Sequence, residues 1–266
     1  MTSRALPLAV LAALAGSVLA DEKLTVIGFN VESGDSEPET VGRVVDLYDG
    51  CDVWGFSEVQ ERSWAETFAR AAERGRSVDY RWILGETGGK DRLVILYNTS
   101  KLELVDSFEL RRVQVQDAYR APLVARFRLR ASSRQFLFLV NHLARGEAGI
   151  RHEQSQRLNR WLRDQSEPVV AVGDYNYDWD WKTGGADHDR GYDELTRDGV
   201  VRWVRPIRFM NTHCGSYDRI LDFVFVGGAA RRWSALSAVL APHVGSCPDD
   251  HQSSDHRPVM GQFLVR

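Results

Sequence analysis

Short apolar runs, each about as long as a β-strand, recur along the chain and end on polar side chains. Residues 24–30 and 52–58 are two such runs, and the residues between them, 37–48, carry valines at helical spacing. The order strand, helix, strand is typical of an α/β fold. Asn30 and Glu32 come where the first run stops, and Glu58 ends the second. Polar groups are therefore expected together at a sheet edge.

The strongest strand signal is the valine- and alanine-rich run at residues 169–173. We expect this strand to be buried on both faces, with Gly173 turning the chain at its end. Asp174 and Asn176 would then emerge at the carboxyl edge of the sheet, where α/β folds commonly place their chemistry. The alternative for an isolated G-D-x-N motif is an Asx-type turn without a catalytic role.

The rest of the pattern predicts one α/β domain over residues 21–266. Strands are expected at 80–84, 92–97, 102–108, 122–129, 135–140, 221–226, 236–240 and 259–265, and helices at 62–74 and 150–162. Residues 175–192 are rich in Asp, Trp and Gly and show little periodicity. We expect them to form a long loop, and loops of this size are usually functional or disordered.

The N-terminus predicts export. Residues 6–20 are apolar, follow Arg4 and end in a small-x-small cleavage pattern, so residues 1–20 are interpreted as a signal peptide cut after Ala20. The alternative is a buried N-terminal helix. Export to the periplasm or the medium permits disulfides. Cys214 and Cys247 lie in polar, loop-like sequence and are the expected pair, whereas Cys51 is expected to be a buried free thiol. The cysteines have no zinc-site spacing.

Charge excludes one mode of binding. The formal net charge is −3, so no global basic field draws the protein to nucleic acid, although a local basic face is compatible with this total. Four aspartates at 178, 180, 187 and 189 suggest either a second cation site or a solvated acidic loop, and we favour the loop. We expect Trp179 and Trp181 to pack inside that loop; stacking on bases or insertion into a membrane interface are the alternatives.

Acidic, amide and imidazole side chains share one position in this pattern, at or near the end of an expected strand. They are Asn30, Glu32, Glu58, Asn141, His142, Asp174, Asn176, Asp222, Asp255 and His256. A mixed sheet can gather such positions into one cleft. Carboxylates hold Mg²⁺, amides bind phosphate oxygens, and a histidine or aspartate takes a proton from water, so the set predicts metal-assisted hydrolysis of a phosphate ester. Histidines 152, 188, 213, 243 and 251 are interpreted as structural.

Six motifs along the chain resemble the endonuclease/exonuclease/phosphatase superfamily, in the order of that superfamily. They are F-N-V-E at 29–32, S-E-V-Q at 57–60, V-N-H at 140–142, G-D-Y-N at 173–176, L-D-F-V-F at 221–225 and S-D-H-R-P-V at 254–259. Each motif alone is weak, but six in order are specific. The resemblance covers nearly the whole chain after residue 20. It implies a four-layered α/β sandwich of two mixed β-sheets flanked by helices, with a divalent-metal site at the sheet edges.

The resemblance also implies roles for individual residues. Glu58 would be the principal Mg²⁺ ligand, with Asn30 and Glu32 beside it and Asp255 in support; Mn²⁺ or Ca²⁺ could replace Mg²⁺. Asp174 would orient or deprotonate the attacking water, and Asn176 would position the phosphate.

Two histidines and an arginine complete the implied site. His256 would be an acid/base or charge-stabilising group, held in its tautomer by Asp222. Asp218 is the alternative partner for His256, and Asp222 is favoured because it opens the clearer strand. His142 and Asn141 would contact the scissile phosphate, as would Arg120, which resembles a phosphate-contacting arginine of the deoxyribonuclease branch.

The leading hypothesis is an exported, Mg²⁺-dependent phosphodiesterase, a nuclease acting on DNA and working as a monomer without a protein partner. Glu32 and Arg120 are the nuclease-like features. One alternative is a sphingomyelinase or phosphoinositide phosphatase acting on membrane lipid, for which the Trp179/Trp181 hairpin is the only candidate membrane contact. The other is a non-catalytic binding module of the same fold.

Overall fold

Two six-stranded β-sheets pack face to face in the computed structural model, which describes residues 21–215, 217–247 and 250–266. The expected signal peptide, residues 1–20, lies outside the described residues. The first sheet has the order β11–β12–β1–β2–β4–β3. Its strands are β1 (Glu22–Asn30), β2 (Val53–Val59), β3 (Tyr80–Leu84), β4 (Arg92–Asn98), β11 (Ser234–Val239) and β12 (Val259–Val265).

The second sheet has the order β5–β6–β7–β8–β10–β9. Its strands are β5 (Leu102–Glu109), β6 (Leu123–Leu129), β7 (Gln135–His142), β8 (Val169–Trp179), β9 (Val201–Trp203) and β10 (Ile220–Gly227). Each sheet contains one parallel pair among the described strands, β1 with β2 and β7 with β8, and its other pairs are antiparallel. Both sheets are therefore mixed, as expected from the sequence.

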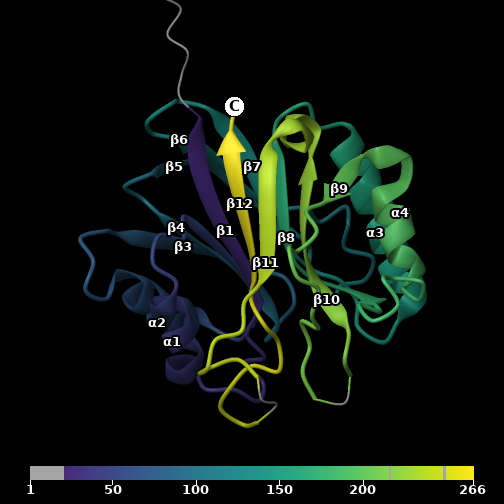
Figure 1. Ribbon diagram of the computed structural model, residues 1–266, viewed down its shortest axis with the longest axis horizontal. Helices are drawn as coiled ribbons and strands as arrows, with labels where there is room; N and C mark the ends of the chain where they lie inside the picture. The colour runs from purple at the N-terminus through teal and green to yellow at the C-terminus, as the bar shows by residue number, and fades with distance from the viewer. Residues whose placement is uncertain (1–20, 216, 248–249) are drawn as a thin grey trace, which may run out of the picture.

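Helices cover the outer face of each sheet (Figure 1). Helices α1 (Pro38–Leu47) and α2 (Arg62–Glu73) pack on the first sheet, and α3 (Ala148–Arg163) and α4 (Arg190–Thr196) pack on the second. Two short 3₁₀ helices, η1 (Arg197–Gly199) and η2 (Gly228–Arg232), follow α4 and β10. The result is the four-layered α/β sandwich that the sequence predicts. No helix in the described ranges is long and apolar enough to span a membrane.

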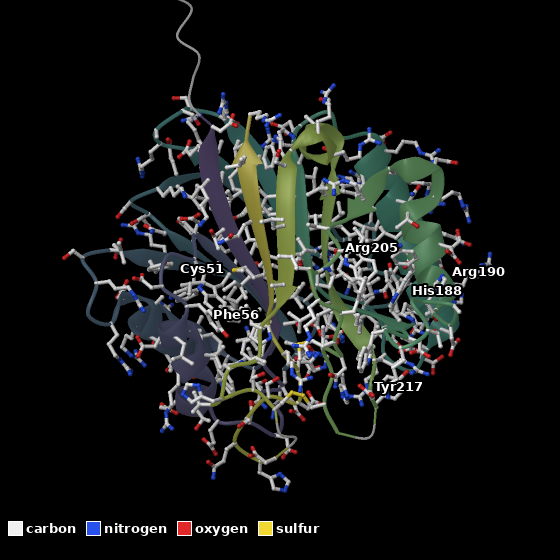
Figure 2. The ribbon with its side chains drawn as sticks, in the orientation of Figure 1. Cys51, Phe56, His188, Arg190, Arg205 and Tyr217 are labelled. Carbon is white, nitrogen blue, oxygen red and sulfur yellow. A yellow bond between two sulfur atoms is a disulfide. The ribbon has the colours of Figure 1, made fainter. Side chains whose placement is uncertain are left out.

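The sheets meet through a dry layer of aliphatic and aromatic side chains, which includes Val26, Phe138 and Val172. They approach so closely that a Cβ added at Gly55 would lie 2.6 Å from Val140 Cγ2. A larger residue there would have to displace side chains of the facing sheet. A second apolar layer lies under α1 and α2, where Cys51 and Phe56 are buried (Figure 2). Cys51 is a buried free thiol, as expected.

The prediction of a loop over residues 175–192 is wrong at both ends. Strand β8 continues to Trp179, and α4 begins at Arg190, so the connection is much shorter. The aromatic residues Tyr175, Tyr177 and Trp179 alternate along β8 and are buried against the α3 and α4 side of the sheet. Burial of these rings outweighs the weak strand propensity of the intervening Asn and Asp residues. Gly173 therefore lies inside the strand and does not end it.

The topology brings four strand ends to one place. Parallel pairing sets the carboxyl end of β1 beside that of β2, and the carboxyl end of β7 beside that of β8. Across the core, β1 contacts β8 and β2 contacts β7. The side chains that follow these strands consequently face one another at a single edge of the sandwich.

Candidate active site

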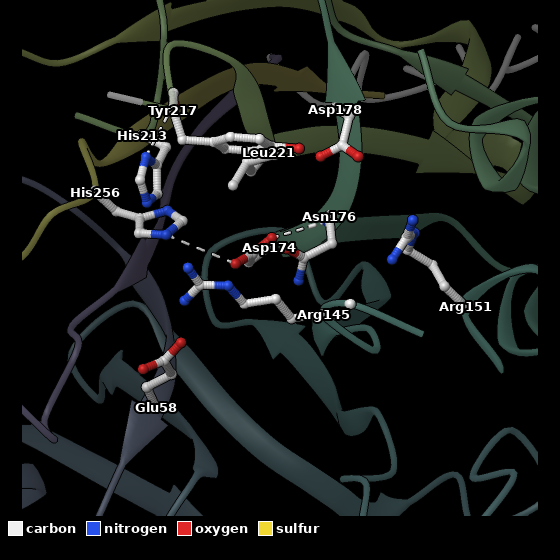
Figure 3. Close-up of a pocket in the computed structure, with 11 residues that line it drawn as sticks. Glu58, Arg145, Arg151, Asp174, Asn176, Asp178, His213, Tyr217, Leu221 and His256 are labelled. Atoms are coloured by element: carbon white, nitrogen blue, oxygen red, sulfur yellow. Dashed lines mark hydrogen bonds and ion pairs between the residues drawn. The ribbon is translucent and has the colours of Figure 1, made fainter. Parts of the chain in front are cut away.

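A cleft of about 290 Å³ opens at this edge (Figure 3). Four of the residues expected from the sequence line it: Glu58 at the end of β2, Asp174 and Asn176 on β8, and His256 before β12. The cleft is also lined by side chains that sequence reasoning did not assign to it, including Arg145, His213 and Tyr217. Residues more than 190 positions apart in the sequence therefore share one polar hollow.

The backbone at the cleft is irregular where side chains must point inward. Glu58 has a φ of 60° and Asn176 a φ of 52°, both in the left-handed region that non-glycine residues rarely adopt. Each residue lies at a register shift, Glu58 where β2 pairs with β4 and Asn176 where β8 pairs with β10. Such bulges re-aim side chains next to active sites. This strain is an observed outlier at the site, and it supports a functional role for both residues.

His256 is held by a buried carboxylate. Its Nδ1 lies 2.7 Å from Asp222 Oδ2, and both side chains are almost completely buried. The partner of His256 is thus Asp222; Asp218 instead accepts a hydrogen bond from Trp181 and pairs with Lys182. Burial alone would lower the pKa of His256, but the charge of Asp222, reinforced by Asp174 and Asp255, raises that pKa to about 10. His256 is therefore protonated at neutral pH.

Asp174 lies at the centre of the constellation. One of its oxygens, Oδ2, lies 3.5 Å from His142 Nε2 and 3.8 Å from His256 Nε2, and it accepts a 3.1 Å hydrogen bond from Asn30 Nδ2. Burial raises the pKa of Asp174 above its ordinary value, and the nearby histidines oppose that rise. A buried carboxylate of raised pKa is a better proton acceptor than an exposed one.

His142 faces Asp174 from β7, and its second partner is Asp91, which sequence reasoning did not identify. His142 Nδ1 lies 3.3 Å from Asp91 Oδ1, and Asp91 Oδ2 forms a 2.7 Å ion pair with Arg120. Burial would raise the pKa of Asp91, but the charges of His142 and Arg120 hold it below its usual value. Asp91 precedes β4 and does not follow a strand, so the strand-end pattern carried no signal for it.

Arg120 and Asn141 are buried and, like His142, are not among the residues that line the cleft. Arg120 is buried, with its guanidinium on Asp91 and near the carbonyl of Leu143. Asn141 is fully buried, and its Nδ2 donates a 2.9 Å hydrogen bond to the Tyr175 hydroxyl. The resemblance implied that both contact the phosphate, which stays a prediction; in the structure each is held by partners within the protein.

The expected metal residues form an acidic group around Glu58. Glu32 Oε2 accepts a 2.7 Å hydrogen bond from the Asp255 backbone N–H, and Asn30 Nδ2 donates to Glu58 Oε1 at 2.9 Å. Burial, followed by the negative charges of Asp255 and Glu58, raises the pKa of Glu32 to about 7. Carboxylates crowded enough to hold a proton at neutral pH suit a divalent cation, so these residues fit Mg²⁺. Asn30 orients Glu58 in this arrangement.

His213 is the histidine that the sequence left as structural and the structure brings to the cleft. Its Nε2 lies 3.0 Å from Asp255 Oδ2, and its ring stands nearly perpendicular to that of His256, with ring centroids 5.0 Å apart. It precedes Cys214 in an irregular segment. A backbone bridge between His213 and His256 joins the two segments and places His213 at the site.

Three of the four aspartates that the sequence singled out in this segment lie near a basic side chain. Asp189 caps α4 and pairs with Arg151, and Asp180 and Asp187 both lie near Arg219. Trp179 is buried, as expected from packing inside the loop. Asp178, the fourth, lies on β8 and lines the cleft.

The predicted disulfide is present. Cys214 and Cys247 are bonded, with their Cα atoms 5.9 Å apart. The bridge joins the segment that carries His213 to the segment that leads to His256. A disulfide is compatible with an oxidising compartment.

Comparisons with known proteins agree with this geometry. The model of the Endonuclease/Exonuclease/phosphatase family matches residues 27–256. The comparison with curated proteins finds no match. A solved endonuclease/exonuclease/phosphatase family protein from Bacteroides thetaiotaomicron superposes with a TM-score of 0.69 at 18% identity, covering 92% of this chain and 99% of that one.

Two further solved structures share the fold. The mannosyl-6-phosphatase Bt3783 of Bacteroides thetaiotaomicron VPI-5482 has a TM-score of 0.67 at 18% identity, covering 91% of this chain and 99% of that one. TDP2 from D. rerio, complexed with a single-strand DNA product, has a TM-score of 0.69 at 16% identity, covering 92% of this chain and 100% of that one. Because the family model spans well over half of the sequence, the chain belongs to the endonuclease/exonuclease/phosphatase family.

Proposed function

We propose that the protein is an exported, Mg²⁺-dependent phosphodiesterase that cleaves nucleic acid, with DNA as its preferred substrate. One observation carries the proposal: two histidine–carboxylate pairs, His256–Asp222 and His142–Asp91, face the same buried Asp174. A phosphodiester needs a base for water and an acid or positive charge for a poor leaving group, and this arrangement can supply both.

Each residue has a distinct task in the proposed reaction. Asp174 accepts the proton of the attacking water, because its burial favours the protonated form. His256, positively charged at neutral pH, stabilises the phosphorane-like charge and can donate its Nε2 proton to the leaving oxygen. His142 binds a non-bridging phosphate oxygen, and Asn176 positions the same group. When bound, Mg²⁺ on Glu58 and Glu32 would neutralise charge on the phosphate.

The choice of nucleic acid rests on the rim of the cleft. Arg145 and Tyr217 line the cleft and are exposed, so a phosphate and a base or sugar can reach them. The structural neighbour TDP2 holds a single-strand DNA product, which is consistent with this choice. The lipid alternative is disfavoured, because Trp179 is buried and Trp181 donates its indole N–H to Asp218. Export is supported by the character of residues 1–20 and by the disulfide.

Plasmid cleavage tests the proposal. The wild-type protein should nick or degrade plasmid DNA with Mg²⁺ and lose this activity in EDTA. His256→Ala should reduce the rate by at least about 100-fold, since it removes the acid. Glu58→Gln should require a higher Mg²⁺ concentration, whereas Glu39→Gln, on the exposed face of α1, should behave as wild type.

Parallel assays identify the substrate class. RNA, sphingomyelin, a sugar phosphate and bis(p-nitrophenyl) phosphate are offered under the same conditions. Release of phosphate from the monoester without cleavage of DNA would replace the nuclease with a phosphatase. A wild-type protein that hydrolyses none of these esters with any divalent ion would leave only the non-catalytic alternative.

A further inference from the structure

The cluster His213, Asp255 and His256 lies beside the proposed Mg²⁺ residues and differs from them in chemistry. One ligand atom from each of the three lies within 4.8 Å of the others, and all three side chains are buried. The group offers two imidazoles and one carboxylate. Magnesium prefers oxygen ligands, whereas two nitrogens and one oxygen suit Zn²⁺ and related transition metals.

The contacts within the cluster are those of neighbouring ligands and not of a closed hydrogen-bond network. His213 Nε2 lies 3.0 Å from Asp255 Oδ2 and His256 Nε2 lies 3.6 Å from Asp255 Oδ1. Asp255 Oδ1 has no hydrogen-bond partner, and the ion pair between His213 Nε2 and Asp255 Oδ2 does not have the geometry of a hydrogen bond. Buried polar atoms without partners are uncommon and call for a ligand, an ion or a water.

The atoms behind the two imidazoles fix which nitrogen faces the cluster. His256 Nδ1 lies 2.7 Å from Asp222 Oδ2, and His213 Nδ1 lies 2.9 Å from the backbone carbonyl of Tyr217. A carboxylate or carbonyl on one nitrogen holds a proton there and leaves the lone pair on the other nitrogen for a metal. Both Nε2 atoms therefore face the cluster, and a metal bound at His256 would displace the Nε2 proton that this histidine carries at neutral pH. Figure 3 shows the two rings adjacent at the cleft wall.

We propose that His213, Asp255 and His256 form a transition-metal site, selective for Zn²⁺ over Mg²⁺, and that its occupation inhibits hydrolysis. Three protein ligands leave a position open toward the cleft, as in other three-ligand zinc sites. Inhibition rests on the proposed function: a metal on His256 Nε2 takes the lone pair that would carry the proton to the leaving group. The same ion would also withdraw Asp255 from the acidic group around Glu58.

Metal binding is measured first, without substrate, so that its result stands apart from that of the nuclease assay. The metal-stripped full-length protein, supplied with saturating Mg²⁺, is titrated with Co²⁺ and with Zn²⁺ against a chromophoric chelator. We expect one equivalent to bind, and Co²⁺ to give the visible absorption of a nitrogen-ligated site. His213→Gln should weaken binding by at least about 10- to 100-fold. His243→Gln, an exposed histidine outside the cleft lining, should bind as wild type.

The wild-type protein also provides a test that depends on no variant. Imidazole nitrogen NMR signals of only two of the seven histidines should shift when Zn²⁺ is added. If His213→Gln fails to fold, Asp255→Asn is titrated in its place. Absence of zinc binding, unchanged affinity in His213→Gln, or shifts at other histidines would each overturn the proposal.

Inhibition is measured for each protein as the hydrolysis rate with Zn²⁺ divided by the rate without Zn²⁺. A change in the basal rate of a variant therefore does not affect the comparison. The ratio should fall at least about 10-fold in the wild type and stay near one in His213→Gln. If zinc binds at the cluster without changing the ratio, the proposed inhibition is wrong and the proposed metal site still stands. If no protein hydrolyses any ester, the proposed function fails while the binding result still decides the site.

Discussion

His142 is held by a pair of charged residues, Asp91 and Arg120. Arg120 pairs with Asp91, and Asp91 lies against His142 Nδ1, so this ion pair can orient the imidazole. We therefore propose that Arg120 is a positioning residue, whereas the resemblance implied a phosphate ligand. The distinction has a kinetic consequence, because a positioning residue acts on the reacting geometry and not on substrate affinity.

Arg120→Met should lower kcat by about 100-fold and leave KM within about threefold. Steady-state kinetics on bis(p-nitrophenyl) phosphate separate the two constants. Arg120→Lys keeps a charge near Asp91 and should recover part of kcat, and circular dichroism checks that each variant folds. A large rise in KM with an unchanged kcat would instead support direct contact between Arg120 and the substrate.

Sequence reasoning at the scale of single residues succeeded where a residue follows a strand. Asp222 was preferred to Asp218 because it opens the clearer strand, and the structure places it 2.7 Å from His256. Asp91 precedes strand β4, and His213 lies in irregular sequence. Packing between distant segments brings both residues to the site. Such positions carry no local periodicity from which a contact could be read.

Among the elements, β8 determines the site most directly. It carries Asp174 and Asn176, and its central Gly173 has a φ of 132°. A Cβ at this position would lie 2.0 Å from the backbone oxygen of Asn141 on β7. Since that oxygen belongs to the neighbouring strand and cannot move alone, the glycine allows β7 and β8 to stay paired beside the cleft.

Gly173→Ala should therefore destabilise the protein by about 3 kcal/mol or more, through a backbone clash and an unfavourable φ. Urea unfolding followed by tryptophan fluorescence measures the change. Gly149→Ala is the matched control, because an added Cβ there meets no atom within 4 Å and Gly149 lies in α3. That control should be stabilised by about 0.5–1 kcal/mol. Equal effects of the two substitutions would contradict this account of Gly173.

The same strand shows why the length of an element is hard to read locally. The segment from Tyr175 to Trp179 alternates aromatic with Asn and Asp, which matches a strand as well as a polar loop. The rings face the layer under α3 and α4, where they are buried, and this burial stabilises the strand. The helices that provide the cover come from other parts of the chain, so the local sequence alone left the question open.

For the whole molecule, the Cys214–Cys247 bridge connects two segments that both end at the cleft. The backbone N–H of Cys214 donates to the Asp255 carbonyl at 2.7 Å, and that of Cys247 donates to the Ser254 carbonyl at 2.8 Å. The disulfide thus helps to hold the backbone segments that carry His213 and His256 side by side.

Reduction of this bridge should lower the free energy of unfolding by about 3–4 kcal/mol, because the 33-residue separation closes a sizeable loop in the unfolded chain. It should also lower the hydrolysis rate, since the loosened segments carry side chains of the cleft. Unfolding and activity are compared with and without a phosphine reductant. The double variant Cys214→Ala/Cys247→Ala should no longer respond to the reductant. A persistent response would place the sensitivity elsewhere.

The sequence by itself determined the fold class, the family, the disulfide and the residues that follow β1, β2, β7 and β8. These features depend on apolar periodicity and on motifs that remain legible one segment at a time. Only the tertiary structure decided that Arg120 pairs with Asp91, that Asn141 bonds to Tyr175, that Asp91 supports His142, and that His213 joins Asp255 and His256. Those relations arise between segments far apart in the chain, where the close packing of two sheets, and no local pattern, sets which side chains meet.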